Sequence, residues 1–408
     1  LFSSLNSLDE ELRRRGSRLL VRKGKPLQVL TELVREINVS AIYAEEDYSP
    51  YARRRDAEIS RHLPLRLTGG ATIHHPLAVV RADGSPYTVF TPFSKAWKSL
   101  PAPSRSLISI PEVFVPPPEI DSEHLPVVSQ PTGFPASEQE AQRRLQAFAE
   151  NLIYTYQENR NRLDFDGTSR LSPYLRFGLI SIRQLVNTSV KAIENAPDSV
   201  AQKSAETWLN ELIWREFYMA ILYHFPYVLR TAFNASMRNI PWQENQEDLR
   251  AWQEGHTGYP VVDAAMRQLK QTGWMHNRAR MIVASFLTKD LLINWQEGER
   301  WFMRWLVDGD PAANNGGWQW AAGVGTDAAP YFRIFNPVLQ GKKFDPEGAY
   351  VRRWVPELAH VPNDSIHEPW LMSADQQRAA SCQIGVDYPA PIVNHRQARE
   401  RVLSAYRR

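Results

Sequence analysis

The stretch "DGDPAANNGGWQWAAG", Asp308 to Gly323, has a polar first half and an aromatic second half. Its asparagines and glycines favour turns and helix caps, and "GGWQW" predicts the start of a helix. On that helix Trp318 and Trp320 lie about 200° apart around the axis. We therefore expect one indole to face inward, towards Trp295 and Trp242, and the other to face a cavity.

The polar half predicts a different role. Asn314 and Asn315 are expected in the turn before the helix, with Asp308 and Asp310 near the end of the helix before it. A flavin needs both kinds of neighbour, because polar groups meet its ring edge and ribose, and aromatic rings can pass it an electron. This segment therefore favours a flavin site.

Composition narrows the class of protein. The 408 residues are 43% hydrophobic and 23% charged, which is typical of a soluble globular chain with two or more domains. No apolar run reaches the roughly 18 residues of a membrane span. The single Cys382 excludes an internal disulfide and favours a reducing, cytoplasmic location. No His/Cys cluster has zinc-ligand spacing, so we expect no metal. A net charge of +3 permits nucleic acid as a partner without arguing for it.

The chain changes character along its length. Residues 17–24 and 39–46 read as strands and residues 26–37 and 49–63 as helices, which predicts a doubly wound α/β domain over residues 1–80, truncated at its start. Residues 81–136 read as a linker, with nine prolines between residues 101 and 135. From Ser137, a cap signal with Glu140 three residues later, the pattern becomes all-helical to residue 408.

Three helical segments carry candidate chemistry. "GTSRLS" (167–172) offers hydroxyls and backbone N–H groups at a helix start, which suits a phosphate cradle or an ordinary cap. "WLNELIWREFY" (208–218) places Trp208, Glu211 and Arg215 on one helix face, as a pocket for a planar ring or as an exposed ion pair. In "WMHNRARM" (274–281), Asn277 and Met281 share a face, and the arginines point elsewhere or into solvent.

These motifs together resemble one family. "GTSRLSPYL", "NELIWREFY", "GYPVVDAAMRQLKQTGWMHNRARM" and "DGDPAANNGGWQWAAGVGTDAAPYFRIFNP" are similar to the photolyase/cryptochrome family, and most similar to its class I cyclobutane pyrimidine dimer photolyases. The resemblance implies an α/β antenna domain, a long linker and a helical FAD-binding domain. It also implies light-dependent DNA repair, in which photoexcited reduced FAD passes one electron to the dimer and splits it.

The resemblance also assigns residues to FAD. Asn314 is expected to face flavin N5, and Arg280 to pair with Asp308. Trp318, Trp295 and Trp242 are expected to form an electron chain that ends near the surface. The remaining cofactor contacts are expected from Tyr156, Thr168, Ser169, Arg170, Leu171, Ser172, Trp208, Arg215, Gly309 and Asp310.

The partner implied by the resemblance is ultraviolet-damaged DNA, bound by a monomer with no membrane contact. Trp214 and Trp320 are expected as apolar walls of the lesion pocket, with Met281 beside the lesion. Glu211 and Asn277 are expected to bond the bases, and Glu211 to stabilise the dimer radical. Contacts to the DNA backbone or pocket rim are expected from Arg160, Arg278, Arg333 and Gln340.

The antenna chromophore and the branch of the family leave alternatives. Folate-type members carry an acid where Ala52 lies, so a deazaflavin type is favoured, with Asp47 and Arg176 as contacts, and FMN stays open. A cryptochrome that senses light without repair is one alternative. A (6-4) photolyase is the other, although that branch has histidines where Asn277 and Met281 stand.

Overall fold

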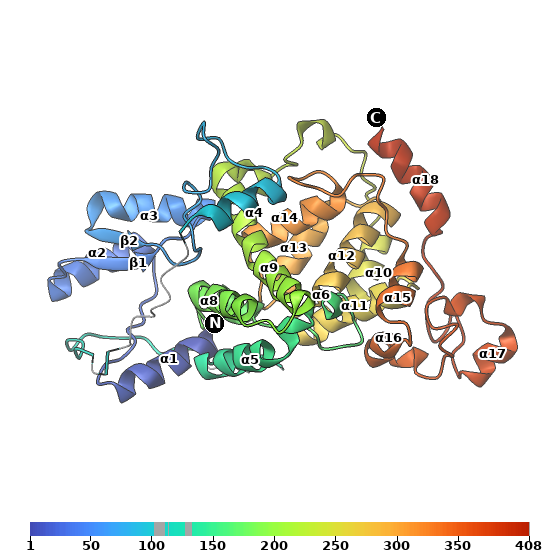
Figure 1. The fold of residues 1–408 in the computed structure, drawn as a ribbon, viewed down its shortest axis with the longest axis horizontal. Coiled ribbons are helices and arrows are strands. Elements are labelled where there is room, and N and C mark those ends of the chain that lie inside the picture. The colour runs from blue at the N-terminus through green and yellow to red at the C-terminus, as the bar shows by residue number, and fades with distance from the viewer. Residues whose placement is uncertain (102–110, 113, 127–132, 408) are drawn as a thin grey trace. The chain divides into compact units, whose positions relative to one another are not determined.

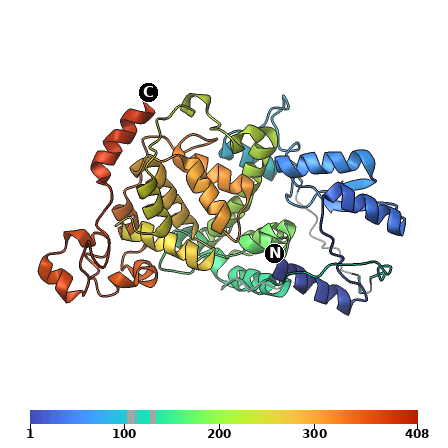
Figure 2. The same cartoon turned by 180° about the vertical axis from the view of Figure 1, so that it is seen from behind.

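The computed structural model describes residues 1–101, 111–112, 114–126 and 133–407. The chain forms two compact units, unit 1 (Leu1–Tyr154 and Ser169–Pro226) and unit 2 (Thr155–Thr168 and Tyr227–Arg408) (Figure 1). Figure 2 shows the same ribbon from behind. The predicted domain limits at residues 80 and 136 do not coincide with this division, because helices up to residue 226 pack in the same unit as the α/β segment. Those limits stay a prediction.

Unit 1 contains the predicted α/β segment. Strands β1 (Ile42–Glu45) and β2 (Leu65–Thr68) pair in parallel with Ile42 opposite Leu65. Helices α2 (Pro26–Ile37) and α3 (Pro50–His62) lie beside them (Figure 1). Ser49 caps α3 by accepting from the Ala52 N–H at 3.3 Å. The expected helix, strand, helix order from residue 26 is therefore confirmed, preceded by helix α1 (Phe2–Arg14), which we did not predict.

The expected strand over residues 17–24 is wrong. That segment forms no strand, and its backbone bonds lie outside the sheet. The Val21 N–H donates to the Ser122 hydroxyl at 2.9 Å, and the Val21 carbonyl accepts from the Glu123 N–H at 2.8 Å. Its backbone groups therefore bond Asp9, Ser122 and Glu123 rather than β1 or β2.

The predicted linker contains a helix. Helix α4 (Phe90–Ser99) buries Phe93 and Trp97 and packs against α9 (Ser199–His224). Elsewhere in residues 81–136 the structure describes no other helix, as the proline content predicts, and residues 102–110, 113 and 127–132 lie outside the described part.

The rest of unit 1 is helical. Ser137 caps α5 by accepting from the Glu140 N–H at 3.1 Å, which confirms the predicted cap. The long helix α9 is capped by Asp198, whose carboxylate accepts from two backbone N–H groups. The helices of this part are α5 (Glu138–Glu150), α7 (Ser172–Arg176), α8 (Ile182–Glu194) and α9, with a short 3₁₀ turn η1 (Leu152–Tyr154).

Unit 2 is helical in its described residues. A π-helix, η4 (Phe286–Asp290), continues directly from α12. The other helices are α6 (Tyr156–Asn159), α10 (Gln246–Glu254), α11 (Pro260–Thr272), α12 (Asn277–Ser285), α13 (Trp295–Trp305), α14 (Pro311–Ala322), α15 (Pro337–Phe344), α16 (Ala349–Trp354), α17 (Ala374–Ala379) and α18 (His395–Tyr406). Short 3₁₀ turns are η2 (Pro226–Leu229), η3 (Ala235–Met237), η5 (Pro356–Leu358) and η6 (Pro369–Leu371).

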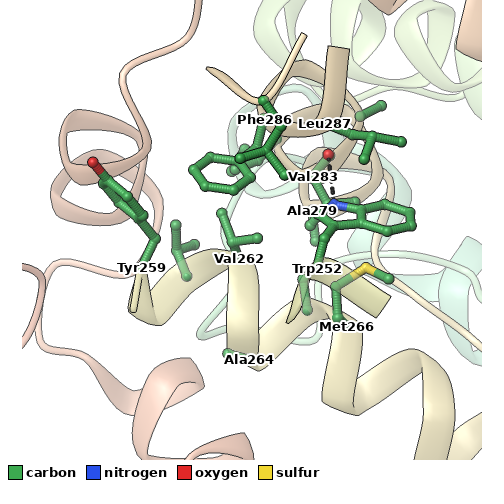
Figure 3. Packing of buried hydrophobic residues seen from close by; sticks show 14 of the residues in the cluster. Trp252, Tyr259, Val262, Ala264, Met266, Ala279, Val283, Phe286 and Leu287 are labelled. Carbon is green, nitrogen blue, oxygen red and sulfur yellow. Dashed lines mark hydrogen bonds between the residues drawn. The ribbon is translucent and has the colours of Figure 1, made fainter. Parts of the chain in front are cut away.

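One apolar core holds unit 2 together. Trp252 from α10 is fully buried beside Met266 of α11 and Val283 of α12, and its indole N–H donates to the Val283 carbonyl at 3.0 Å (Figure 3). Phe286 and Leu287 at the start of η4 complete this face of the core (Figure 3). Burial of such side chains contributes about 1.5–3 kcal/mol each, so the core fixes α12 and η4 firmly.

The helix of the quoted segment starts earlier than we expected. Asp310 caps α14, because its carboxylate accepts from the N–H groups of Ala312 and Ala313 at 3.0 and 2.9 Å. Pro311 occupies the first helical position, where its missing N–H costs nothing. Asn314 and Asn315 therefore lie within the helix, and the expectation of a preceding turn is wrong.

Candidate functional site

Helix α9 carries the predicted acid and two indoles in unit 1. Trp208 is buried, whereas Glu211 and Trp214 are half-buried. Arg215 is half-buried too, and its Nη1 donates to the Ala71 carbonyl at 2.6 Å. Arg215 therefore bonds the segment before the predicted linker. This contact goes beyond the exposed ion pair with Glu211 that the sequence left open.

Phe90 of α4 and Glu216 of α9 itself support this face of α9, and we predicted neither from the sequence. Trp214 stacks on Phe90 of α4, with ring centroids 3.7 Å apart. Glu216 is buried and accepts from the Trp97 indole N–H and the Ile73 N–H, both at 2.6 Å. Burial raises the pKa of Glu216 to about 7 against the effect of these donors. The "FTPFSKAW" segment (90–97), an amphipathic run within the predicted linker, was the available signal.

The "GTSRLS" segment leads into α7, so a helix does start at this segment, as predicted, and it begins at Ser172. In unit 2, the Thr168 Oγ1 is buried and has no hydrogen-bond partner among the described residues. A Cβ at Gly167 would lie 2.7 Å from the Cβ of Asn159, so only glycine fits there. In unit 1, Arg170 adopts φ +49°, and Leu171 is buried. Helix α7 has only five residues, so its dipole adds little to an anion site.

Near Thr168 in the chain, Tyr156 and Arg160 lie on the short helix α6 and at its end. Tyr156 is buried, and the Arg160 guanidinium lies 5.6 Å from the centre of its ring. This pair gives unit 2 a planar cation next to an aromatic ring.

Asp308, before α14, forms the expected ion pair with Arg280. The Arg280 guanidinium bonds both oxygens of Asp308 at 2.8 and 3.1 Å, and Asp308 is buried. Both bonds come from Nη2, and the Arg280 Nε donates to the Met275 carbonyl at 2.8 Å, so the guanidinium is held in place against the carboxylate. The next residue, Gly309, is half-buried, and the Asp310 carboxylate caps α14.

The Asn314 amide lies on the side of α14 that packs against α13. Its Nδ2 donates to the Glu299 carbonyl at 3.0 Å, which leaves the Oδ1 as the acceptor that the side chain presents. The neighbouring Asn315 bonds the Glu299 carboxylate at 2.9 Å. Burial raises the pKa of Glu299.

The three tryptophans of the predicted electron chain lie on neighbouring segments of unit 2. Trp318 is 2% exposed and packs onto Gly298 of α13, where any Cβ would collide with its indole. Trp295 lies one turn earlier on α13, on the same face. Gln243, next to Trp242, donates its N–H to the Leu292 carbonyl at 2.8 Å, three residues before Trp295. The ring contacts of Trp318 are to Phe302 and Trp252.

The predicted lesion-side residues of unit 2 are partly exposed. Trp320 is half-buried, in contrast to Trp318. On α12 the Asn277 Nδ2 lies 4.0 Å from the Met281 Sδ, so these two side chains do share a face. Arg278 donates to the Asn161 Oδ1 at 2.6 Å and lies 4.6 Å from the centre of the Phe344 ring, and burial lowers its pKa.

The last predicted residues lie apart from these groups. Arg333 is exposed and Gln340 half-buried, on the segment leading into α15 and on α15 itself. In unit 1, Asp47 is exposed and accepts from the Ser49 N–H at 2.7 Å. Arg176 ends α7 and is half-buried.

The predicted set is thus divided between the two units. Unit 2 brings together the Arg280–Asp308 pair, Asn314 and the three tryptophans on α12, α13 and α14 and the segments beside them. Unit 1 brings together the α9 residues and their α4 support. In the described ranges, no group of three or more His, Cys, Asp or Glu side chains could hold a metal ion. No helix within those ranges has both the length and the apolar character needed to cross a bilayer.

Two family models match this chain, and both describe DNA photolyase. Residues 1–112 match the family model for DNA photolyase, and residues 208–408 match the FAD binding domain of DNA photolyase. The chain is 43% identical over 418 residues to a deoxyribodipyrimidine photo-lyase of Escherichia coli K12, covering 99% of this chain and 87% of the relative. It is 41% identical to a protein of the same name from Alkalihalophilus pseudofirmus, covering 100% of this chain and 87% of the relative.

Solved structures give the same fold. A bacterial class III photolyase from Agrobacterium tumefaciens superposes with a TM-score of 0.94 at 37% identity, covering 100% of this chain and 87% of that one. A Synechocystis cryptochrome gives 0.88 at 33% identity, with 99% and 86% covered. An archaeal photolyase from Sulfolobus tokodaii, solved with two FAD molecules, gives 0.83 at 32% identity, with 100% and 87% covered.

Proposed function

The chain belongs to the DNA photolyase family, and from this premise we propose that it splits cyclobutane pyrimidine dimers in ultraviolet-damaged DNA. It is a light-dependent DNA repair enzyme with an FAD-binding domain. The observation that carries the choice of lesion is the contact between Asn277 and Met281 on the exposed face of α12. An amide beside a thioether suits a base edge next to an apolar cyclobutane ring, whereas a (6-4) enzyme has histidines there.

The residues of the chain fit FAD. The buried Thr168 hydroxyl lacks a partner among the described residues, which an oxygen of a phosphate group would supply. Ser169, Arg170, Leu171 and Ser172 extend this segment, and Arg170 adopts a backbone conformation uncommon for its type. Bound FAD supplies the light-driven one-electron chemistry. Trp208, Tyr156, Arg215, Gly309 and Asp310 are proposed as further contacts.

Arg280 orients the buried Asp308 carboxylate, which is proposed to accept from the ribose or the ring edge. Asn314 is proposed to face flavin N5, and its bond to the Glu299 carbonyl supports this role, because it holds the amide with Oδ1 presented. A fixed amide holds a proton at N5 by accepting from it.

Lesion binding is assigned to half-buried and exposed side chains. Trp214 and Trp320 are proposed as apolar walls, with Met281 beside the lesion. Glu211 and Asn277 are proposed to bond the extruded bases, and extrusion costs least where pairing is already damaged. Arg160, Arg278, Arg333 and Gln340 are proposed contacts to the backbone or rim, which position the duplex without reading its sequence.

Trp318, Trp295 and Trp242 are proposed to pass an electron from the surface inward. The support is the packing of Trp318 on Gly298, one turn from Trp295 on α13, and the Gln243–Leu292 bond beside Trp242. A second chromophore of the deazaflavin type at Asp47 and Arg176, a monomeric state and a cytoplasmic location stay predictions.

The test is repair of a defined substrate. Purified protein, reduced and illuminated with blue light, should restore a synthetic duplex that carries one thymine dimer. The same duplex with a (6-4) lesion should stay unrepaired. Denaturation should release all flavin from the polypeptide, since no covalent link is proposed. Repair of the (6-4) duplex alone would reject the proposed lesion.

A cryptochrome is the second candidate, and the similarity to the Synechocystis cryptochrome favours it. A light sensor without repair would leave both damaged duplexes unchanged under light, while its flavin still responds to illumination. The same experiment therefore decides between the two functions.

A further inference from the structure

A buried lysine lies beside the outer end of the proposed electron chain. Lys289 in η4 is 1% exposed, and its Nζ donates to the Ala322 carbonyl at 2.7 Å. The same Nζ lies 3.6 Å from the centre of the Tyr406 ring. The Tyr406 ring in turn meets Trp242 edge to face, with ring centroids 6.1 Å apart at 88°. The lysine thus lies within roughly 10 Å of the Trp242 indole, with one aromatic ring between them.

The Lys289 amine is held at the C-terminal end of α14. Ala322 is the last residue of α14, the helix that carries Trp318, and its carbonyl also accepts from the Tyr406 hydroxyl at 2.7 Å. Gly323 caps α14 with φ +76°, and a Cβ there would lie 3.4 Å from Nζ. The lysine therefore meets the negative end of a helix dipole, where an ammonium is tolerated.

Among the described residues, no carboxylate pairs with this amine. Asp290, the next residue, is bonded to the His395 Nδ1 at 2.6 Å, and Arg401 of α18 donates to the Asp290 carbonyl. Tyr406 is the ionisable group of α18 that faces Nζ, and burial raises its pKa.

The other helices packed on η4 place their charges elsewhere. Helix α14 has no ionisable side chain between Pro311 and Ala322. Arg280 of α12 is paired with Asp308, and Glu299 of α13 is bonded to Asn315. Burial by itself lowers the pKa of Lys289 to about 7.

We propose that Lys289 is a positioning residue for photoreduction, whose charge, acting across Tyr406, sets how long an electron vacancy persists on Trp242. This rests on the proposed electron chain. In the step concerned, one electron leaves Trp242 and is taken up through Trp295 and Trp318 by the oxidised cofactor. Trp242 is left as a radical cation until a thiol in solution returns one electron.

A positive charge near a radical cation raises its energy by Coulomb repulsion. With Lys289 charged, the electron returns to Trp242 more readily and less cofactor stays reduced. With Lys289 neutral, the vacancy lasts longer and the thiol competes better. At this separation the repulsion changes the balance about 2- to 20-fold for effective dielectric constants between water and a protein surface.

The experiment measures the quantum yield of photoreduction with a thiol, and the decay of the tryptophan radical by transient absorption, between pH 6 and pH 8. In the parent protein both the yield and the lifetime should rise with pH. Lys289→Met should give a high, flat profile, and Lys289→Arg, which keeps its charge, a low, flat profile. Lys343→Met is the matched control, because the exposed Lys343 lies 5.4 Å from the centre of the Phe344 ring. It should behave as the parent.

A second readout is independent of light. The unfolded chain holds the lysine proton up to about pH 10.4, whereas the folded protein releases it near pH 7. The unfolded state therefore binds more protons in this window, and stability rises with pH. Urea unfolding of the purified proteins measures this effect. Between pH 7 and 9 the folding equilibrium constant of the parent, relative to that of Lys289→Met, should rise by up to about tenfold per pH unit.

The outcomes separate the two proposals. Persistence of the parent's pH profile in Lys289→Met, while Trp242→Phe abolishes photoreduction, overturns the role of Lys289 and leaves the chain intact. Unchanged photoreduction in Trp242→Phe rejects the electron chain itself. If Lys289→Arg does not fold, the Lys289→Met profile and the urea series still decide the matter.

Discussion

The indole ring of Trp214 lies flat on the phenyl ring of Phe90, with ring centroids 3.7 Å apart and 4° between the ring planes. One face of the indole is therefore covered by a residue of α4. Tyr218 lies beside the same indole, with ring centroids 5.5 Å apart and 33° between the ring planes. Phe217 meets both rings edge to face, at 5.5 and 6.0 Å, and fixes the stack. Helix α4 thus acts as a support for a residue of α9.

The first prediction concerns this support. Phe90→Leu keeps an apolar side chain but removes the stack, so Trp214 loses its fixed orientation. Aromatic pairs contribute about 0.5–1.5 kcal/mol beyond burial, and affinity for dimer-containing DNA should fall about 2- to 12-fold by fluorescence anisotropy. Affinity for undamaged duplex should not change. Val89→Ala, at the exposed neighbouring position, is the control. An equal loss on both duplexes would show that Phe90 acts on general DNA binding instead.

The helix caps of unit 1 could be predicted, because their signals are local. Ser137 with Glu140, and Ser49 with Pro50, are caps whose partners lie within three residues. The predicted strand at 17–24 does not form because Val21 and Lys23 bond Ser122 and Glu123, about a hundred positions away. An extended pattern shows that a strand can form but not which partner satisfies its backbone.

The candidate site shows the same limit. The shared face of Asn277 and Met281 follows from helical spacing alone. The start of α14 was misjudged although Asp310 and Pro311 are a standard cap and first residue, because the asparagines and glycines that follow also favour turns. The packing of Trp318 on Gly298 and the stack of Phe90 on Trp214 are tertiary contacts, which spacing cannot reveal.

The second prediction concerns the Thr168 hydroxyl, which is buried without a partner among the described residues. Thr168→Val keeps the shape and removes the hydroxyl. A hydrogen bond to a charged group contributes about 1.5–3 kcal/mol, so the dissociation constant of FAD should rise about 10- to 150-fold. The FAD-free protein should be as stable as the parent or slightly more so, because an unsatisfied polar atom is gone. Thr188→Val on α8 is the control, and equal FAD affinity in Thr168→Val would remove Thr168 from the phosphate site.

The third prediction is a pH dependence of stability from Glu216. Burial raises its pKa to about 7 from 4.5. The folded protein therefore holds a proton that the unfolded chain releases, and the free energy of unfolding falls as pH rises across this window. Glu216→Gln lacks that loss. Its stability relative to the parent should improve by up to about 3 kcal/mol between pH 4.5 and pH 8.

Urea denaturation at several pH values measures this difference. Glu206→Gln, an exposed carboxyl on the same helix, is the control and should show little change. A constant difference between Glu216→Gln and the parent would mean that the donors from Ile73 and Trp97 keep the carboxylate ionised throughout.

The last prediction separates the two indoles of α14. Trp318 is 2% exposed and packs on Gly298 towards Trp295, whereas Trp320 is half-buried. Trp318→Phe keeps most of the packing but is far harder to oxidise, so photoreduction of oxidised FAD should be abolished. Repair by enzyme that is already reduced should survive, because that electron does not use the chain.

Trp320→Ala should do the reverse. It removes a proposed wall of the lesion pocket, where stacking on a base contributes about 1–3 kcal/mol, so affinity for dimer DNA should fall about 5- to 150-fold while photoreduction continues. The test measures both the photoreduction rate and the affinity for dimer DNA in each of the two variants. If both indoles only stabilise the core, both activities fall together in each variant, in step with the fraction of folded protein. A loss of photoreduction in Trp318→Phe at full dimer affinity requires distinct roles for the two faces of α14.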